Sequence, residues 1–138
     1  MGIWAILAAP LLMSNDPRHI SPKVKSILLN KEVIGVNQDQ YGIPGMRVFH
    51  NSSYDIWMRY VGPIHRGRYS IVIGFLNRLA TNGYAKLSVR LKDLKVDSQL
   101  EFRDLFKHKY LGIYAPFEKL KVIVPPAGIV LVKGIPIR

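Results

Sequence analysis

The side chains in this 138-residue sequence that could act as acids, bases or metal ligands are nine carboxylates and four histidines. The histidines are scattered, and no two have the spacing of metal ligands on one element. They are His19, His50, His65 and His108. The absence of cysteine excludes a disulfide framework, a thiolate metal site and a cysteine nucleophile. We therefore expect no metal and no cofactor, with the histidines in loops or facing solvent.

Three aspartates lie where a carboxylate could either bind a ligand or hold the backbone. Asp16 ends the triplet Ser14-Asn15-Asp16, Asp39 lies in the polar stretch 37–45, and Asp104 follows Arg103. We interpret Asp39 as a tether between two parts of the chain. We interpret Asp104 as a turn or cross-strand partner.

The stretch "IWAILAAPLLMSND", residues 3–16, must position that triplet. A signal peptide requires a positive charge before its apolar segment, and none precedes this stretch. The stretch is also too short to span a membrane, and Pro10 interrupts it. The pattern instead predicts the end of an apolar helix over 3–8 and a short strand over 9–13. That strand would be buried on both faces, as parallel strands are, with residues 14–16 as the loop after it.

The next segment has a helix start at Ser21-Pro22, with serine as N-cap and proline at the first helical position. Apolar residues then recur at helical spacing, and we expect the helix to end near Asn30-Lys31. Residues 33–36 are interpreted as a short extended exit. Residues 37–45 are rich in turn formers and predict a linker, which a protease should cut first.

From Met46 onward the apolar period is two, which is typical of strands. The pattern of short strands and regular turn signals predicts an antiparallel β-sandwich. Residues 69–76 are nearly all apolar and indicate a central strand, whereas residues 117–122 alternate and should show one face to water. The predicted strands cover 46–50, 54–60, 69–77, 84–91, 99–106, 117–124 and 127–133.

The formal charge of +11 is uneven, because residues 45–138 hold sixteen of the twenty basic residues and six of the nine acidic ones. A basic domain can bind nucleic acid or an anionic surface. Here the basic residues alternate singly with apolar ones, and stacking aromatics are not interleaved with them. We therefore expect a solvated strand face and no nucleic-acid partner.

One predicted strand and two helical pieces cannot form a stable α/β domain, because a parallel strand needs parallel neighbours. The sequence thus predicts a mostly β fold: a C-terminal antiparallel β-sandwich at 45–138, preceded at 1–44 by the remnant of an α/β domain. We expect the chain to be the tail of something longer.

Three motifs carry a resemblance to a known family: "WAILAAPLLMSND" (4–16), "ISPKVKSILLNKEVIGVNQD" (20–39) and "YDIWMR" (54–59). They resemble the C-terminal part of glycoside hydrolase family 27, whose animal members are lysosomal α-galactosidases and α-N-acetylgalactosaminidases. That family has a (β/α)8 TIM barrel followed by an antiparallel β-sandwich. The resemblance implies that residues 1–44 are the end of helix 7, strand 8, helix 8 and the linker, and that 45–138 are the sandwich.

The resemblance also implies a retaining glycosidase that removes terminal α-linked galactose or N-acetylgalactosamine from glycolipids and glycoproteins. Its two catalytic aspartates lie on barrel strands 4 and 6, so we expect no catalytic residue in this chain and no activity from it alone. Ser14, Asn15 and Asp16 would line the rim of the substrate pocket, although a capping role in the loop is favoured for Asn15 and Asp16.

Further expectations concern glycosylation, partners and cellular location. Asn51-Ser52-Ser53 is an N-glycosylation sequon in a predicted turn. The expected partners are the N-terminal barrel of the full-length enzyme, the glycoside substrate reached through it, and a second copy in a homodimer. The parent protein would be lysosomal or secreted. Trp4 and Trp57 are interpreted as core residues rather than sugar-stacking platforms.

Two other function classes stay open. The chain could be a free-standing β-sandwich module that binds carbohydrate or an anionic surface. It could also be a basic nucleic-acid binder, which we rank last.

Overall fold

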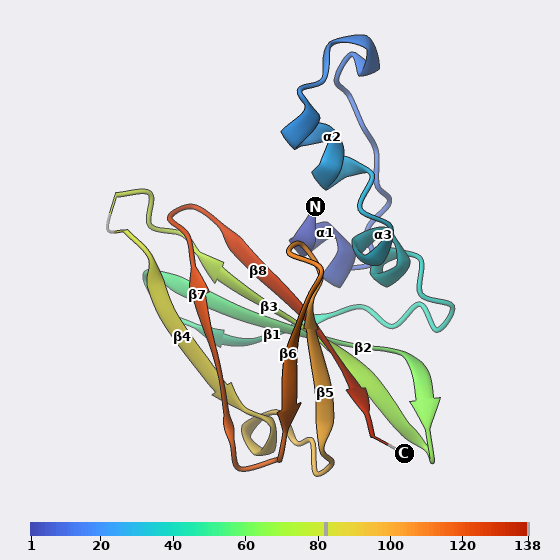
Figure 1. Cartoon of the computed structure of the whole chain (residues 1–138), viewed down its shortest axis with the longest axis vertical. Helices are drawn as coiled ribbons and strands as arrows, with labels where there is room; N and C mark the ends of the chain where they lie inside the picture. The colour runs from blue at the N-terminus through green and yellow to red at the C-terminus, as the bar shows by residue number, and fades with distance from the viewer. Residues whose placement is uncertain (82, 138) are drawn as a thin grey trace.

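The computed structural model describes residues 1–81 and 83–137 and shows three layers (Figure 1). The middle layer is a six-stranded antiparallel sheet, with strand order β1-β2-β3-β8-β5-β6. One face of this sheet packs against the two-stranded sheet β4-β7, and the other packs against short helices near the N-terminus. The predicted antiparallel β-sandwich is therefore confirmed.

The elements run in this order along the chain. The helices are α1 (Gly2–Ile6), the 3₁₀ turn η1 (Pro17–His19), α2 (Pro22–Leu28), α3 (Lys31–Asn37) and, later, the 3₁₀ turn η2 (Leu91–Leu94). The strands are β1 (Met46–His50), β2 (Tyr54–His65), β3 (Arg68–Asn77), β4 (Ala85–Arg90), β5 (Leu100–Asp104), β6 (Lys109–Tyr114), β7 (Lys119–Val124) and β8 (Ile129–Pro136).

The continuous apolar run of β3 follows from burial on both faces. Ile71, Ile73 and Phe75 point into the core between the two sheets. Val72, which lies between them in sequence, points to the opposite face and packs with the helices. Successive side chains of a strand point to opposite faces, so a strand covered on both sides carries apolar residues at consecutive positions. The prediction of a central strand here is confirmed.

β7 shows the contrasting pattern. Leu120, Val122 and Val124 are buried, whereas Lys119, Lys121 and Ile123 between them are exposed. The second sheet therefore covers the core with one face and shows the other face to water, as the alternation predicted.

Among the strands predicted after Met46, the largest difference from the structure lies between residues 99 and 114. The expected strand over 99–106 ends as β5 at Asp104, and a further strand, β6, follows at Lys109–Tyr114. A hairpin turn separates them, because Asp104 Oδ1 accepts hydrogen bonds from the amides of Phe106 and Lys107 at 3.0 and 2.9 Å. Asp104 is thus the turn-forming residue that its sequence context indicated.

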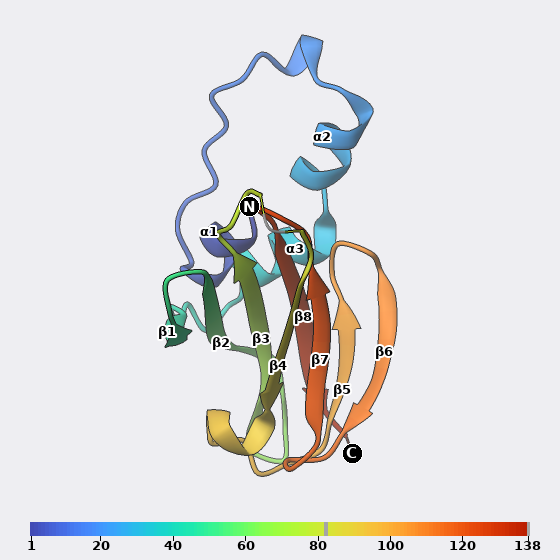
Figure 2. The same ribbon diagram turned by 90° about the vertical axis from the view of Figure 1, so that its left-hand side faces the viewer.

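The prediction of a strand over residues 9–13 is wrong. These residues are irregular, and Leu12 and Met13 are 78% and 53% exposed. A strand exists only where a neighbour completes its hydrogen-bond ladder, and within the described residues no strand pairs with this segment. Figures 1 and 2 show it as an extended connection leading away from the sheets.

The helical predictions are partly right. Ser21 Oγ caps α2 by accepting from the amide of Val24 at 3.3 Å, as expected from Ser21-Pro22. The predicted extended exit over 33–36 is wrong, because these residues lie in α3. Asn30 starts this second helix, and its Oδ1 accepts from the amides of Glu32 and Val33 at 3.0 and 3.1 Å.

Val33 and Val36 explain why the β-branched stretch is helical. Both side chains are buried in a cluster with Ala5 and Ile6 of α1 and with residues of the six-stranded sheet. Helical spacing puts the two valines on one face, and burial of that face outweighs their weak local preference for strand. The sheet contributes Val61, Val72 and Leu131 to the cluster, and the turn after β5 contributes Leu105.

Candidate functional site

The predicted rim triplet lies at the far end of the irregular segment, where Asp16 begins the turn η1. Its Oδ1 accepts from the Arg18 amide and the Arg18 Nε, both at 3.0 Å, and its Oδ2 accepts from Arg18 Nη2 at 3.0 Å. His19 Nδ1 lies 3.1 Å from the same Oδ2. The side-chain hydrogen bond from Arg18 is the main reason that the pKa of Asp16 falls to about 2. Asp16 is an ionised cap of this turn, as the capping interpretation expected.

Ser14 and Asn15 line a surface depression of about 390 Å³ between the irregular segment and the helices. Its walls are largely apolar, and Trp4, Leu12 and Met13 among them are strongly exposed. The other residues around it are Met1, Leu11, Leu28, Ile34 and Gln38. The depression has no paired carboxylates, and Trp4, which is 49% exposed, is not the core residue that we expected.

All nine acidic side chains have a structural partner in the part of the chain that is described. Asp39 Oδ2 accepts from the amide of Gly62 at 2.8 Å and so joins the polar linker to β2, which supports its interpretation as a tether. Glu32 accepts two hydrogen bonds from Arg103 of β5, at 2.8 and 3.0 Å. The remaining carboxylates, apart from Asp16 and Asp104 above, hold other local contacts: Asp55, Asp93, Asp97, Glu101 and Glu118.

A buried arginine, Arg59 of β2, connects the N-terminal segment to the sheet. Its side chain is 1% exposed. Nη1 donates to the carbonyl oxygens of Ala5 and Val36 at 2.6 and 2.7 Å, and Nε donates to that of Ile43 at 2.6 Å. Two of these acceptors lie in the last turns of α1 and α3, where helix carbonyls lack partners and the helix dipole favours a cation. Desolvation lowers the pKa of Arg59 from its ordinary value, against the attraction of Asp39, which raises it.

Ile6 is the apolar counterpart of this contact. It is fully buried against the sheet, and a Cβ atom added at Gly74 of β3 would lie only 2.5 Å from its Cδ1 atom. A side chain at this position would force Ile6 to move, so glycine allows the present close approach of α1. Asn30 adds a third contact, because its Nδ2 donates to the carbonyl oxygen of Leu105 at 2.8 Å. We call Arg59, Ile6 and Asn30, with the Glu32–Arg103 pair, the docking seam.

The sequence indicated only part of this seam. Arg59 ends the motif "YDIWMR", but nothing in its local pattern indicated that its side chain is buried. Two signals were available in the sequence. Arg59 lies on the face of its strand opposite to the face that carries Ile56 and Met58. Asn30 directly precedes a Lys-Glu pair, as a helix N-cap does. Trp57 is half-buried at the same seam, with the Arg47 guanidinium 5.7 Å above its ring.

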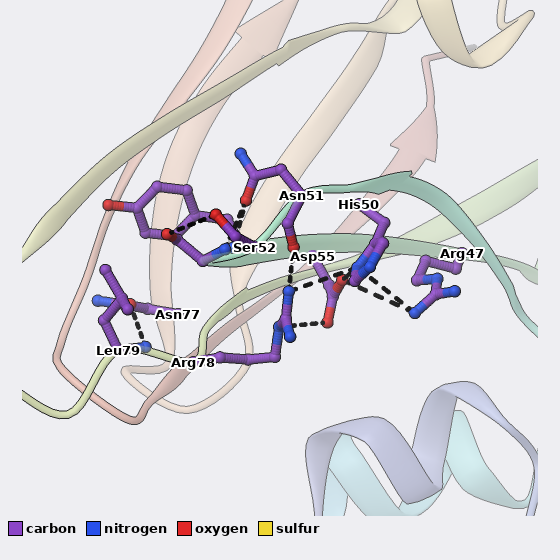
Figure 3. Close-up of polar contacts among 10 residues, drawn as sticks. Arg47, His50, Asn51, Ser52, Asp55, Asn77, Arg78 and Leu79 are labelled. Carbon is purple, nitrogen blue, oxygen red and sulfur yellow. Dashed lines mark hydrogen bonds and ion pairs between the residues drawn. The ribbon is translucent and has the colours of Figure 1, made fainter.

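A second polar cluster surrounds Asp55, at the turn between β1 and β2 (Figure 3). Asp55 is 4% exposed, and its oxygens lie 2.5 Å from His50 Nδ1 and 3.1 Å from Arg78 Nε. Arg78 also donates to the carbonyl oxygen of Asn51. The cluster fixes the hairpin that carries the predicted glycosylation site, and sequence reasoning did not identify it.

The four histidines lie apart. His19 and His108 are exposed, His50 belongs to the Asp55 cluster, and His65 lies at the end of β2. Within residues 1–81 and 83–137, no three His, Asp or Glu side chains gather as metal ligands. No described helix is long and apolar enough to cross a membrane.

Comparisons with known proteins match both parts of the chain. Residues 1–39 match the family model described as alpha galactosidase A, and residues 51–133 match the one described as alpha galactosidase C-terminal beta sandwich domain.

Two curated relatives span nearly the whole chain. Human alpha-galactosidase A is 31% identical over 96% of it, and chicken alpha-N-acetylgalactosaminidase is 33% identical over 95%. The aligned regions are 31% and 32% of those proteins, so the chain spans about a third of their length. Among solved structures, alpha-galactosidase I from Mortierella vinacea superposes on 98% of the chain with a TM-score of 0.84 and 30% identity, over 34% of its own length.

Proposed function

Because the chain belongs to the α-galactosidase family, glycoside hydrolase family 27, we propose that it serves as the C-terminal part of a retaining glycosidase. The substrates would be terminal α-linked galactose or N-acetylgalactosamine on glycolipids and glycoproteins, the two sugars named in its curated relatives. In this proposal residues 1–44 complete a (β/α)8 barrel, and residues 45–138 are the sandwich that supports it.

The observation that carries the proposal is the docking seam together with what it leaves outside. Arg59, Ile6 and Asn30 fix α1 and the start of α3 to the sheet. Residues 9–29, between them, extend away from the sheets (Figure 2). They expose large apolar side chains. These are Leu12, Met13, Val24, Ile27 and Leu29. Such a segment fits a barrel unit whose neighbours lie elsewhere in a longer protein.

The chemistry of the full protein would follow retaining glycosidases. Retention requires two carboxylates about 5 Å apart, one as nucleophile and one as acid and base. The carboxylates of this chain are engaged in caps, turns and ion pairs, so the two catalytic aspartates would come from the rest of the barrel. Ser14 and Asn15 would then lie at the rim of the sugar pocket, with Asp16 holding the loop that presents them.

The cellular setting is part of the same proposal. A parent enzyme of this family would act in the lysosome or after secretion, and would form a homodimer. The sequon at Asn51 agrees with passage through the secretory pathway.

A second candidate function, a sandwich that binds an anionic surface, is favoured by one observation. The outer face of β4 and β7 carries four basic side chains, which are Lys86, Arg90, Lys119 and Lys121. This role is compatible with the first, because the face lies away from the docking seam.

A chimera tests the glycosidase proposal. The N-terminal two-thirds of a family member are joined to this chain in place of its own C-terminal third. We expect the purified chimera to hydrolyse a chromogenic α-galactoside or α-N-acetylgalactosaminide, whereas the 138-residue chain alone should not.

The control for the chimera is the same barrel without the added chain, which should be insoluble or inactive. Turnover by the isolated chain, with contaminating glycosidases excluded, would contradict the proposal. A chimera that melts cooperatively but hydrolyses neither sugar would contradict it as well.

A further inference from the structure

Strand alternation gathers four basic side chains on the outer face of the β4–β7 sheet. Ala85, Leu120, Val122 and Val124 point inward and are buried. The residues between them point outward and are exposed, and they are Lys86, Ser88 and Arg90 on β4 and Lys119, Lys121 and Ile123 on β7. We call these six residues, with Tyr84 and Phe117 at the strand starts, the basic face.

The register of the two strands brings the cations together. Arg90 lies directly opposite Lys119, and Lys121 lies opposite Ser88. Like charges opposite one another on a sheet destabilise it, so folding stability alone does not favour this arrangement. Asp93 pairs with Arg90 at 3.0 Å and offsets one charge. For Lys86, Lys119 and Lys121, no described carboxylate lies within ion-pair distance.

Exposed apolar side chains border the cations at both ends of the sheet. Tyr84 is 72% exposed beside Lys86, and Phe117 is 73% exposed beside Lys119. Ile123, opposite Lys86, is 56% exposed. Cations in the middle with aromatic and aliphatic groups at the ends match a surface that is anionic and has an apolar layer just beneath it.

The basic face stays free when the N-terminal segment is docked. α1 and α3 pack on one face of the six-stranded sheet, and the β4–β7 sheet packs on the other (Figure 1). In Figure 2, β4 and β7 stand in front and α1 and α3 lie behind the sheets. A partner bound to the basic face would therefore leave the docking seam and the predicted rim loop uncovered.

We propose that the basic face binds the surface of an anionic lipid bilayer, an inference that rests on the second candidate function and names the surface it would bind. Alternate residues of a strand are about 7 Å apart, so several lipid headgroups can meet the lysines at once. Basic residues are attracted to anionic headgroups, and aromatic side chains prefer the headgroup level of the interface. A basic face with its aromatic rings at the ends, rather than between the cations, fits a bilayer better than a single strand of nucleic acid, which needs interleaved stacking platforms.

Vesicle co-sedimentation of the 138-residue chain at physiological ionic strength tests this proposal. One set of vesicles is pure phosphatidylcholine, and the other is phosphatidylcholine with about a third of anionic phosphatidylserine. The chain should bind the anionic vesicles and not the neutral ones. The triple variant K86Q/K119Q/K121Q should bind about 100-fold more weakly, at roughly a factor of five for each lysine.

The matched control is K23Q/K25Q/K109Q, which removes the same charge from exposed lysines outside the basic face. It should lose no more than about threefold in affinity, since only long-range attraction changes. Both triple variants should keep the melting temperature of the parent chain, because all six lysines are exposed. A third variant, Phe117→Ser, should weaken vesicle binding without changing the charge.

Several results would overturn the proposal. Equal losses in the two triple variants would assign binding to net charge alone. Equal binding to neutral vesicles would assign it to the exposed apolar residues near the N-terminus. Binding of a labelled DNA duplex as tightly as anionic vesicles, through the same three lysines, would replace the bilayer by a general polyanion. No binding to anionic vesicles would contradict the proposal. The lysines would then serve only to keep the edge strands from pairing with strands of another chain.

Discussion

Arg59 Nη1 donates to the carbonyl oxygen of Ala5 at 2.6 Å, so a side chain of the sandwich holds the C-terminal end of α1. The two residues are 54 positions apart in the sequence, and both are almost fully buried. This contact fixes α1 to the face of the six-stranded sheet that lies opposite the sandwich core and leaves residues 9–29 outside the packed part.

Replacing Arg59 by methionine should lower the free energy of unfolding by about 3 kcal/mol, because two buried carbonyl oxygens and one part-buried carbonyl oxygen lose a charged donor. Urea unfolding followed by circular dichroism measures the change. The matched control is Arg68→Met on the exposed start of β3, which should change the free energy of unfolding by less than about 0.5 kcal/mol. Equal effects of the two substitutions would contradict the assignment of Arg59 to the seam.

The Glu32–Arg103 pair should make α3 docking depend on pH. The Arg103 guanidinium is the main cause that holds the pKa of Glu32 below its ordinary value of 4.5, with His108 adding to it and partial burial opposing it. Since the folded-state pKa is the lower one, the contribution is complete well above pH 4.5 and is lost as the pH falls through the folded-state value. Glu32→Gln should cost about 1 kcal/mol at pH 7, as a partly exposed bidentate pair does, and little at acidic pH.

Unfolding of the parent chain and of Glu32→Gln in urea, measured from pH 7 down to pH 3, checks this sign. A difference between the two that grows toward acidic pH would contradict it. A double-mutant cycle with Arg103→Met should show that most of the free energy lost in Glu32→Gln is interaction energy between the two side chains.

Limited proteolysis should cut first between residues 10 and 20 rather than in the linker 37–45 that the sequence alone suggested. Among the described residues, no backbone hydrogen bond is donated by the amides of residues 11–16. The linker is held by the Arg59–Ile43 and Asp39–Gly62 contacts and by the bond from the Gly45 amide to the Ile6 carbonyl oxygen at 2.8 Å. Thermolysin digestion with mass spectrometry identifies the first cut.

Hydrogen exchange gives an independent measurement of the same division. Amides 11–16 should exchange almost as fast as in an unfolded peptide, and those of residues 71–75 should be the slowest. Protection of the two segments at similar levels would contradict the description of residues 9–29 as undocked.

Asn51 should carry an N-glycan when the chain is expressed through a eukaryotic secretory pathway. Asn51 is exposed at the β1–β2 turn, where its Oδ1 accepts from the amides of Ser53 and Tyr54 and no described group binds its Nδ2 (Figure 3). Ser53→Ala should abolish the mobility shift that a glycosidase specific for N-glycans removes. Ser52→Ala, which keeps the sequon, should retain it, and an unshifted parent chain would contradict the prediction.

Local patterns determined several elements of this protein. Ser21-Pro22 starts a helix because its cap and its fixed φ act within one turn. The apolar run of β3 and the alternation of β7 follow from which faces are covered, and the turn at Asp104 is made by its own neighbours. The mostly β fold and the family motifs could therefore be predicted from the sequence alone.

Only the tertiary structure decided the rest, because it depends on partners far away in the sequence. Residues 33–36 are helical since Val33 and Val36 meet Val72 and Leu131 of the sheet, and residues 9–13 form no strand since no neighbouring strand completes a ladder. The burial of Arg59 could not be predicted from the sequence either. An arginine on a strand is ordinarily exposed, and this one is buried because two helix ends supply acceptors for its side chain. Composition and spacing specify what a residue can do locally, whereas long-range contacts select which of those options lowers the free energy of the whole chain.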